Sequence, residues 1–304
     1  MVTVFCEIAQ AVERVRSEFP DVEVVDITAG IPEGVRGDVL FGGWGLHSTE
    51  AVARGVHWLQ LSGTGIDNTR TDLLGVETVT CARGASAVPI SEYVLASMLA
   101  FGRGFPQHWL RAVPKHWNFQ RMETLAGSTL GLIGLGGIGE RVARLATAFD
   151  MRVIAVRRTR APSPVAGVEV VTSLDSMLQH VDHLVLAAPG TANTRRIIDA
   201  DALKRVKPGV HLVNIARGSL VDQDALREAL DDGRVARASL DVVEPEPLPE
   251  GHWLYSHPKV FLTPHSSWSS TAFFDAAIEI FVANLRRYLA GEPLEHLIDR
   301  DEGY

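Results

Sequence analysis

Residues 129–139 read TLGLIGLGGIG, and they are the most informative segment of the sequence for the fold. An apolar run over 129–133 predicts a buried strand, and an amphipathic repeat over 138–149 predicts a helix directly after it. The turn between them has the spacing G-x-G-x-x-G, formed by Gly134, Gly136 and Gly139. Between a strand and a helix, this spacing is typical of chains that bind the pyrophosphate of a dinucleotide.

Each glycine of the turn has a separate physical task. Gly134 allows a tight turn, Gly136 lets the backbone approach the pyrophosphate, and Gly139 lets the helix pack closely on the strand. The N-terminus of the helix adds unpaired amides and the positive end of its dipole. We therefore predict a bound dinucleotide, with a purely structural turn as the alternative. The predicted phosphate-binding residues are Gly134, Gly136, Gly137, Ile138 and Gly139.

The strand expected over 152–156 indicates which dinucleotide is bound. A protein that selects NAD carries Asp or Glu about 20 residues past the glycines, where the carboxylate binds the ribose hydroxyls. This chain has Arg157, Arg158 and Thr159 there, and guanidinium groups match a 2′-phosphate with paired hydrogen bonds. We predict that these residues bind NADP(H) in preference to NAD(H), with a solvated basic loop as the alternative.

The composition excludes several classes of protein. Of the 304 residues, 46% are hydrophobic and 22% charged, as in ordinary globular proteins. The 29 Lys and Arg against 37 Asp and Glu give a net charge of −8, which is unsuited to a broad grip on nucleic acid or an anionic membrane. Cys6 and Cys81 have no metal-binding spacing, so we predict no metal, no disulfide framework and a reducing compartment. Because we find no signal-peptide pattern and no apolar run of roughly 18 residues, the predicted location is the cytoplasm.

Three downstream segments place reactive side chains at predicted strand ends. They are residues 213–222 with Arg217, residues 240–249 with Glu244 and Glu246, and residues 262–268 with His265. Open α/β sheets bind their ligands at the carboxyl ends of the strands. A planar guanidinium suits the carboxylate of a 2-oxo acid, and an imidazole can give a proton to a ketone oxygen near neutral pH.

In chain order, these segments resemble the D-isomer-specific 2-hydroxyacid dehydrogenase family, and in particular its NADPH-dependent glyoxylate/hydroxypyruvate reductases. The resemblance covers nearly the whole chain and is strongest over residues 125–267. The matching segments are Gly134–Gly139, Pro189–Thr191 with Thr194, Asn214–Gly218, Leu240–Val242, Glu246–Leu248 and Thr263–His265, with weaker matches at Ser62–Asp67 and Ser91–Glu92. The chain departs from the family where Arg157 and Arg158 replace an acidic residue, and at Ser266–Trp268, which leaves the size of the substrate open.

The resemblance implies a role for each matching side chain. Arg217 would hold the substrate carboxylate and polarise the carbonyl, His265 would give the proton, and Glu246 would pair with His265 and orient it. Asp241 would contact the nicotinamide carboxamide. Backbone groups of Thr64 and Gly65 would complete the carboxylate site. Further predicted contacts are Pro189, Thr194 and Ala216 for the cofactor and Trp268 for the substrate pocket.

The sequence leaves alternatives to these roles open. Arg217 could form a surface salt bridge, His265 could cap a helix or lie in the core, and Glu244 is a rival of Glu246 for the acidic role. The family pattern, which has its acid directly before Pro-Leu, selects Glu246.

The resemblance therefore implies an NADP-dependent oxidoreductase that transfers a hydride from NADPH to a small 2-oxo acid, such as glyoxylate or hydroxypyruvate, to give a D-2-hydroxy acid. It also implies a homodimer. One alternative is a non-catalytic NAD(P)H-sensing protein like the transcriptional corepressors that resemble this family. Another is a methyltransferase that uses the glycine turn for S-adenosylmethionine, although such an enzyme needs an acidic residue where this chain has Arg157.

The expected architecture is α/β, because short apolar runs alternate with amphipathic stretches along the whole chain. We predict two doubly wound parallel-sheet domains, Rossmann-like and flavodoxin-like, with a cleft between them. A discontinuous substrate-binding domain is expected over residues 1–96 plus 281–304, and a dinucleotide-binding domain over residues 97–280.

Overall fold

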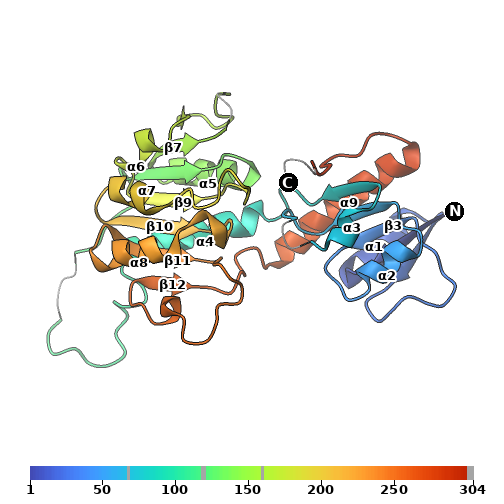
Figure 1. Ribbon diagram of the computed structural model, residues 1–304, viewed down its shortest axis with the longest axis horizontal. Coiled ribbons are helices and arrows are strands. Elements are labelled where there is room, and N and C mark those ends of the chain that lie inside the picture. The colour runs from blue at the N-terminus through green and yellow to red at the C-terminus, as the bar shows by residue number, and fades with distance from the viewer. Residues whose placement is uncertain (67–68, 118–120, 159–160, 300–304) are drawn as a thin grey trace. The chain divides into compact units, whose positions relative to one another are not determined.

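The computed structural model describes residues 1–66, 69–117, 121–158 and 161–299 (Figure 1). The chain divides into two compact units, here called unit 1, which consists of Met1–Ser86 with the segment from Ser269 onward, and unit 2, Ala87–Trp268. The predicted boundaries differ from this division, since they fall inside helices α4 (Ala87–Gly102) and α9 (Thr271–Ala290). Each helix packs along its length within a single unit, so the chain crosses between units at the helix ends.

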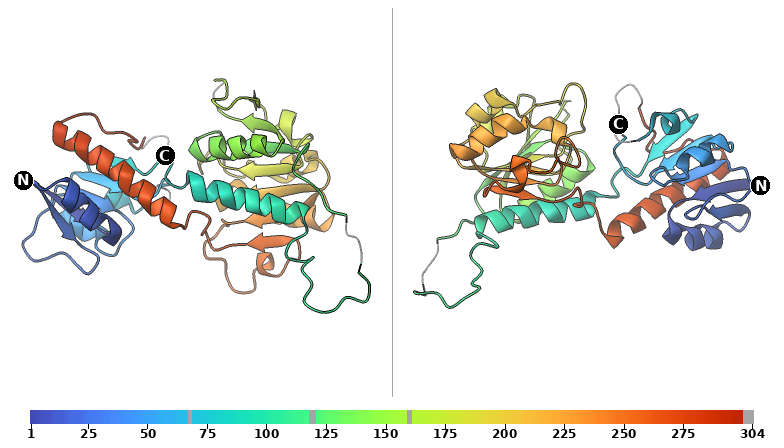
Figure 2. Two further views of the ribbon diagram at one scale, coloured as in Figure 1. Left: turned by 180° about the vertical axis from the view of Figure 1, so that it is seen from behind. Right: turned by 60° about the horizontal axis from the view of Figure 1, so that its bottom comes forward.

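Unit 1 contains a parallel sheet with the strand order β2-β1-β3-β4-β5. Its strands are β1 (Val2–Cys6), β2 (Val22–Asp26), β3 (Val39–Gly42), β4 (Trp58–Leu61) and β5 (Thr78–Cys81). Its helices are α1 (Ala9–Glu18), α2 (Ser48–Ala53), α3 (Thr71–Leu74) and α9. Helix α9 lies along the sheet beside α1 (Figure 2), and its Phe281 ring stacks on Phe41 of β3 with the ring centroids 4.3 Å apart. This strand order is the flavodoxin-like one.

Unit 2 contains a seven-stranded parallel sheet with the order β12-β11-β10-β9-β6-β7-β8. Its strands are β6 (Thr129–Ile133), β7 (Arg152–Val156), β8 (Val168–Val171), β9 (His183–Leu186), β10 (Val210–Asn214), β11 (Val235–Leu240) and β12 (Val260–Leu262). Its further helices are α5 (Gly137–Ala148), α6 (Asp175–Leu178), α7 (Ala200–Arg205) and α8 (Gln223–Asp231), with 3₁₀ turns at Gly218–Leu220 and Trp253–Tyr255. The order follows the Rossmann pattern with one added edge strand. The prediction of two doubly wound parallel-sheet domains is therefore confirmed.

The cores explain why these segments fold as they do. Strands β9 and β10 are buried over their whole length, as expected for parallel strands that are covered on both faces. Two apolar clusters in unit 2 and one in unit 1 contain most of the buried aliphatic side chains. Helix α9 begins where the Ser270 hydroxyl accepts the Phe273 amide and ends at Gly291 in the left-handed conformation, φ +69°.

The sequence predictions also concerned the two cysteines, membrane-spanning segments and metal sites. Cys6 and Cys81 are both buried free thiols, and burial raises the pKa of Cys6 to about 12. Within the described ranges, no helix is long and apolar enough to cross a membrane, and no group of three His, Cys, Asp or Glu side chains is arranged to hold a metal ion.

Candidate active site

The glycine turn has the geometry that its sequence predicts. Gly134 has φ +99°, and a Cβ there would lie 2.7 Å from the Ala187 carbonyl oxygen, so only glycine fits between β6 and the chain after β9. A Cβ at Gly139 would collide with the Gly134 carbonyl oxygen, because helix α5 starts directly against the turn. Gly136 differs, since nothing lies within 4 Å of the position of its missing side chain.

This open side of Gly136 tests whether a dinucleotide fits. Gly136 is the N-cap of α5, so the first backbone amides of the helix, those of Gly137, Ile138 and Gly139, have no partner within the helix. A pyrophosphate needs bare backbone on that side and positive dipole behind it. The residues present therefore suit the group that the sequence predicts.

The basic residues follow the neighbouring strand at the same edge of the sheet. The Gly134 amide donates to the Val156 carbonyl at 3.0 Å, so the end of β7 lies beside the glycine turn. Arg157 comes next and donates to the Pro162 carbonyl at 3.5 Å, and Arg158 is exposed. Thr159 lies outside the described residues.

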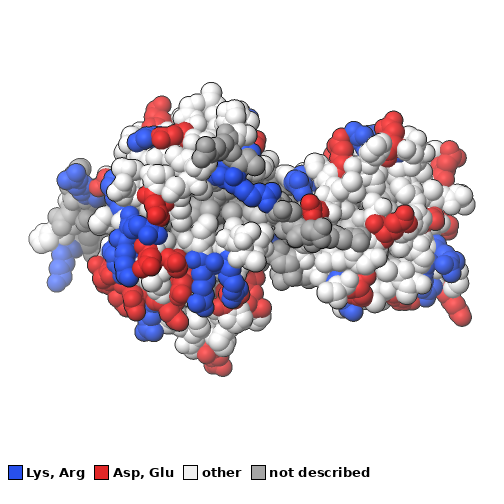
Figure 3. All heavy atoms as spheres, turned by 45° about the horizontal axis from the view of Figure 1, so that its top comes forward, with Lys and Arg blue, Asp and Glu red and all other residues white. Residues whose placement is uncertain are grey.

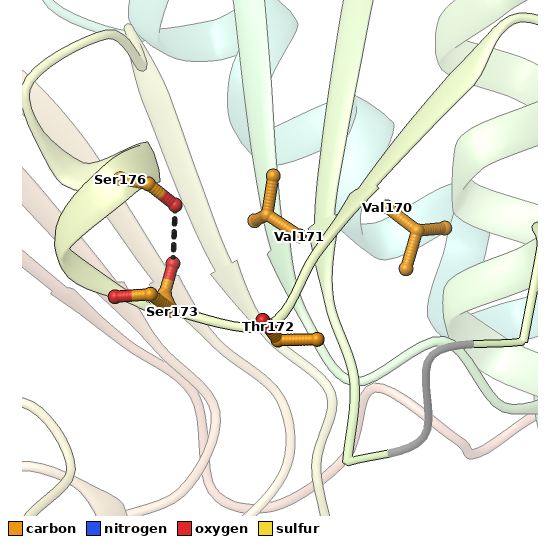
Figure 4. Close-up of a pocket in the computed structure, with 5 residues that line it drawn as sticks. All are labelled: Val170, Val171, Thr172, Ser173 and Ser176. Carbon is orange, nitrogen blue, oxygen red and sulfur yellow. Dashed lines mark hydrogen bonds between the residues drawn. The ribbon is translucent and has the colours of Figure 1, made fainter.

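A hollow of about 460 Å³ lies at the end of the next strand, β8 (Figure 4). Val156 and Val171 are paired in register, so Thr172 follows β8 one residue past the pair, as Arg157 follows β7. The Ser176 hydroxyl of α6 donates to the Ser173 carbonyl at 2.7 Å. The sequence analysis missed this hydroxyl-lined hollow, because no motif marks β8. The lining residues are Val170, Val171, Thr172, Ser173 and Ser176.

The loop after β9 carries two of the predicted cofactor contacts. The Thr194 hydroxyl donates to the Pro189 carbonyl at 2.7 Å and accepts the Thr191 amide at 2.8 Å, which closes the loop on itself. A Cβ at Gly190 would lie 2.9 Å from Cγ of Arg217. This loop therefore packs directly on the stem of the arginine.

Arg217 lies on a turn that Asn214 holds at the end of β10. The Asn214 side chain donates to the Arg217 carbonyl at 2.8 Å and accepts the Ala216 amide at 3.1 Å. The guanidinium donates to the Ala216 carbonyl at 2.7 Å. Gly218 then packs so closely on the Val243–Glu244 peptide that a Cβ would collide with it. The arginine turn and the acidic turn after β11 are therefore neighbours.

His265 and Glu246 form a hydrogen-bonded pair. His265 Nδ1 and Glu246 Oε2 are 2.8 Å apart, and their side chains are 34% and 32% exposed. The other Glu246 oxygen accepts the Val243 amide at 3.0 Å, which fixes the carboxylate in place. Because Nδ1 faces the carboxylate, Nε2 is the ring atom that can act on a ligand.

The rival carboxylate has different partners. Glu244 accepts two hydrogen bonds from Arg195, at 2.9 and 3.0 Å, and its carbonyl accepts the Gln223 amide group at 2.6 Å. These contacts anchor the turn. The geometry therefore brings Glu246, and not Glu244, to the histidine.

Asp241 is the centre of the histidine loop. It is 1% exposed, and its carboxylate accepts the Thr263 hydroxyl at 2.6 Å, the Ser266 amide at 2.8 Å and the Ser267 amide at 3.0 Å. Its carbonyl accepts the His265 amide at 2.8 Å. Any contact with a nicotinamide would be made by a carboxylate that already holds this loop.

Trp268 also belongs to the histidine loop. Its indole N–H donates to the His265 carbonyl at 2.8 Å, and the ring packs against the apolar core of unit 2. Its role as a pocket residue stays a prediction.

The predicted carboxylate-binding backbone lies in unit 1. Thr64 and Gly65 follow β4, and the Thr64 hydroxyl donates to the Ala82 carbonyl at 3.2 Å. Trp44, 48% exposed, lies close to the neighbouring Gly63.

Charge on the molecular surface is mixed. Lys and Arg alternate with Asp and Glu on the face shown in Figure 3. Binding of an anionic ligand therefore depends on local groups such as Arg157, Arg158 and Arg217, as the net charge also requires.

A Rossmann sheet with an open glycine turn, a histidine–carboxylate pair and an arginine at adjacent strand ends is typical of nicotinamide-dependent dehydrogenases. The chain belongs to the D-isomer specific 2-hydroxyacid dehydrogenase family, because the family's model of the NAD binding domain matches residues 95–267.

Individual relatives agree with this family. The chain is 35% identical over 246 residues to D-3-phosphoglycerate dehydrogenase of Methanocaldococcus jannaschii, covering 78% of this chain but 46% of that relative. It is 32% identical over 226 residues to glycerate dehydrogenase of Methylorubrum extorquens, covering 71% and 70% of the two chains. The chain thus spans less than half the length of the first relative.

A solved structure matches both units. The NADPH-dependent glyoxylate/hydroxypyruvate reductase of Sinorhizobium meliloti, crystallised with NADP and sulfate, has a TM-score of 0.84 and 25% sequence identity, with 100% of each chain covered.

Proposed function

We propose that this protein reduces a small 2-oxo acid, such as glyoxylate or hydroxypyruvate, to the D-2-hydroxy acid with NADPH. The observation that carries the proposal is the pair of His265 and Glu246, 2.8 Å apart, on turns adjacent to that of Arg217. The names of similar proteins, a glycerate dehydrogenase and a glyoxylate/hydroxypyruvate reductase, support the substrate class.

The residues divide the work of the reaction. Bound NADPH supplies the hydride. Arg217 holds the substrate carboxylate and draws electron density from the carbonyl, so that negative charge develops on its oxygen. His265 gives that oxygen a proton from Nε2, and Glu246 holds and orients the ring through its hydrogen bond with Nδ1. Carbonyl, hydride and proton together give the hydroxy acid.

NADPH is proposed over NADH on the basis of Arg157 and Arg158. NAD enzymes have a carboxylate at the end of this strand, where it binds the ribose diol. This chain has the two arginines after β7 instead. The hydroxyls of Thr172 and Ser173, which follow the adjacent strand β8, suit the polar ribose of the cofactor's adenosine. Equal efficiency with both cofactors, or a preference for NADH, would contradict this choice.

A panel of 2-oxo acids, each with NADPH and with NADH, tests the activity. We expect NADPH oxidation with glyoxylate or hydroxypyruvate, and its loss in His265→Ala while the dissociation constant of NADPH stays within about twofold. Tight NADPH binding without turnover of any 2-oxo acid would instead favour the second candidate, an NAD(P)H-sensing protein of the corepressor type.

A homodimer is part of the proposal. The segment between α4 and β6 exposes large apolar side chains, whose burial in a second copy would remove them from water. These are Trp109, Leu110, Val113 and Trp117, with exposures of 57%, 61%, 96% and 86%.

A further inference from the structure

A hydrogen-bonded chain connects helix α4 to the histidine loop. Tyr93 on α4 places its hydroxyl 2.8 Å from the Thr263 hydroxyl, which in turn lies 2.6 Å from the Asp241 carboxylate. The motifs that mark the active site include neither Tyr93 nor its link to Thr263.

The chemistry of Asp241 fixes the direction of these bonds. A carboxylate only accepts, so the single Thr263 proton must point to Asp241. The Thr263 oxygen then accepts from Tyr93, whose O–H is the donor. Burial raises the pKa of Tyr93, which keeps the phenol protonated and able to donate.

The hydrogen-bonded chain ends at His265, whose backbone conformation needs support from its surroundings. His265 has φ +51°, a left-handed conformation that is unfavourable for a residue other than glycine. Such a conformation persists only where its surroundings determine it. Asp241 supplies them, since it accepts the Thr263 hydroxyl and the amides of the three residues from His265 to Ser267.

We propose that Tyr93 and Thr263 are positioning residues, which orient Asp241 so that it holds the imidazole of His265 against Glu246. The inference rests on the proposed reductase function for its kinetic consequences. Its geometric part, that loss of the Tyr93 hydroxyl moves the His265 ring, does not depend on any activity.

The kinetic test compares Tyr93→Phe with Thr263→Val and Thr263→Ser. In Tyr93→Phe we expect kcat to fall roughly twofold to tenfold, the factor that one hydrogen bond contributes. Thr263→Val should lose more and Thr263→Ser should retain nearly full kcat, because only serine keeps the hydroxyl. KM should stay within about twofold, and the primary deuterium isotope effect on kcat should rise as the chemical step slows.

Tyr288→Phe is the matched control. It removes a phenol that makes a 2.6 Å hydrogen bond to His57 in unit 1, so it should lower stability without changing kcat or the isotope effect. An unchanged kcat in Tyr93→Phe, or an equal loss in Thr263→Ser and Thr263→Val, would overturn the proposal.

NMR of the protein with its histidine rings labelled with ¹⁵N tests the positioning role independently of the reductase activity. The His265 signal, assigned with His265→Gln, should shift in Tyr93→Phe and stay in place in Tyr288→Phe. If no 2-oxo acid is reduced but the signal shifts, the reductase function fails and the positioning role stands. A His265 signal that does not respond to Tyr93→Phe overturns the positioning role, whatever the activity.

Discussion

The two carboxylates of Glu244 and Glu246, only two positions apart, have different tasks. Glu246 pairs with His265, whereas Glu244 is bound by Arg195 and Gln223. Their spacing in the sequence does not distinguish them, but their hydrogen-bond partners do.

This difference gives a paired test. Glu246→Gln keeps the shape of the side chain but removes the carboxylate that orients the His265 ring, so kcat for 2-oxo acid reduction should fall by roughly 10²-fold or more. Glu244→Gln should stay within about threefold of the native kcat. Steady-state NADPH oxidation measures both, and an equal loss in the two variants would mean that the acid has been misassigned.

The sequence predicted site residues where local motifs carry them. Arg217, Glu246 and His265 each stand in a short motif at a strand end, so the sequence alone proposes them as site residues. Tyr93 could not, because its partner Thr263 lies 170 positions away and only the folded sheet brings them together. The same holds for the link from Asp241 to Ser267.

The glycines of the turn between β6 and α5 have separate roles. We expect Gly136 to serve cofactor binding and Gly139 to serve folding. Gly136 has open space where a Cβ would stand, while a Cβ at Gly139 would collide with the Gly134 carbonyl. Gly136→Ala should therefore keep the melting temperature within about 2 °C but weaken NADPH binding at least tenfold. Gly139→Ala should lower both. Calorimetry and fluorescence titration check this, and normal NADPH affinity in Gly136→Ala would remove the turn from the binding site.

Strands β9, β10 and β11 share a buried polar cluster beneath α4. His183 Nδ1 lies 3.2 Å from His211 Nδ1, and His211 Nε2 lies 2.9 Å from the Ser239 hydroxyl. Only one proton fits between the two Nδ1 atoms, so at least one ring must be neutral. Burial lowers the pKa of His183 to about 4 and that of His211 well below its usual range, with His183 and Arg237 adding to the second shift.

The cluster predicts a loss of stability in acid. Unfolded histidine titrates near pH 6.5, so between about pH 6.5 and 4 the unfolded chain binds protons that the folded chain excludes. The free energy of unfolding should therefore decrease as the pH is lowered. The loss from His183 alone should reach about 2–3 kcal/mol near pH 4.5. Urea titrations should show a smaller fall in His183→Asn and an unchanged one in the control His116→Asn, which alters an exposed ring. An identical pH dependence in all three proteins would contradict the assignment.

The helices and strands were predicted best where burial is continuous. Strands β6 and β7 have the predicted bounds, because their apolar runs stop at Gly134 and Arg157. Strands β9 and β10 end at Leu186 and Asn214, although buried residues such as Ala188 and Ile215 continue the apolar pattern into the loops, so the sequence alone does not mark these strand ends. The residues of edge strand β8 are only partly buried or exposed, so no continuous apolar run marks this strand.

At the scale of the whole molecule, the proposed dimer rests on the exposed apolar segment between α4 and β6. Trp109→Ser combined with Trp117→Ser removes two large exposed rings and should shift the protein from dimer to monomer. Sedimentation velocity over a range of concentrations measures the change. A native protein that sediments as a monomer at every concentration would rule out the dimer.

The chain crosses between the units only at residues 86–87 and 268–269, so unit 2 is an uninterrupted insertion into unit 1. The glycine turn, Arg217, the hydrogen-bonded pair of Glu246 and His265, and Tyr93 all lie in that single insertion. The residues proposed to carry the reaction therefore lie on one continuous stretch of chain, while Thr64 and Gly65, proposed to complete the carboxylate site, lie on the flanking part. Recombination at these two junctions would exchange the parts proposed to choose the substrate and leave the proton-transfer groups intact.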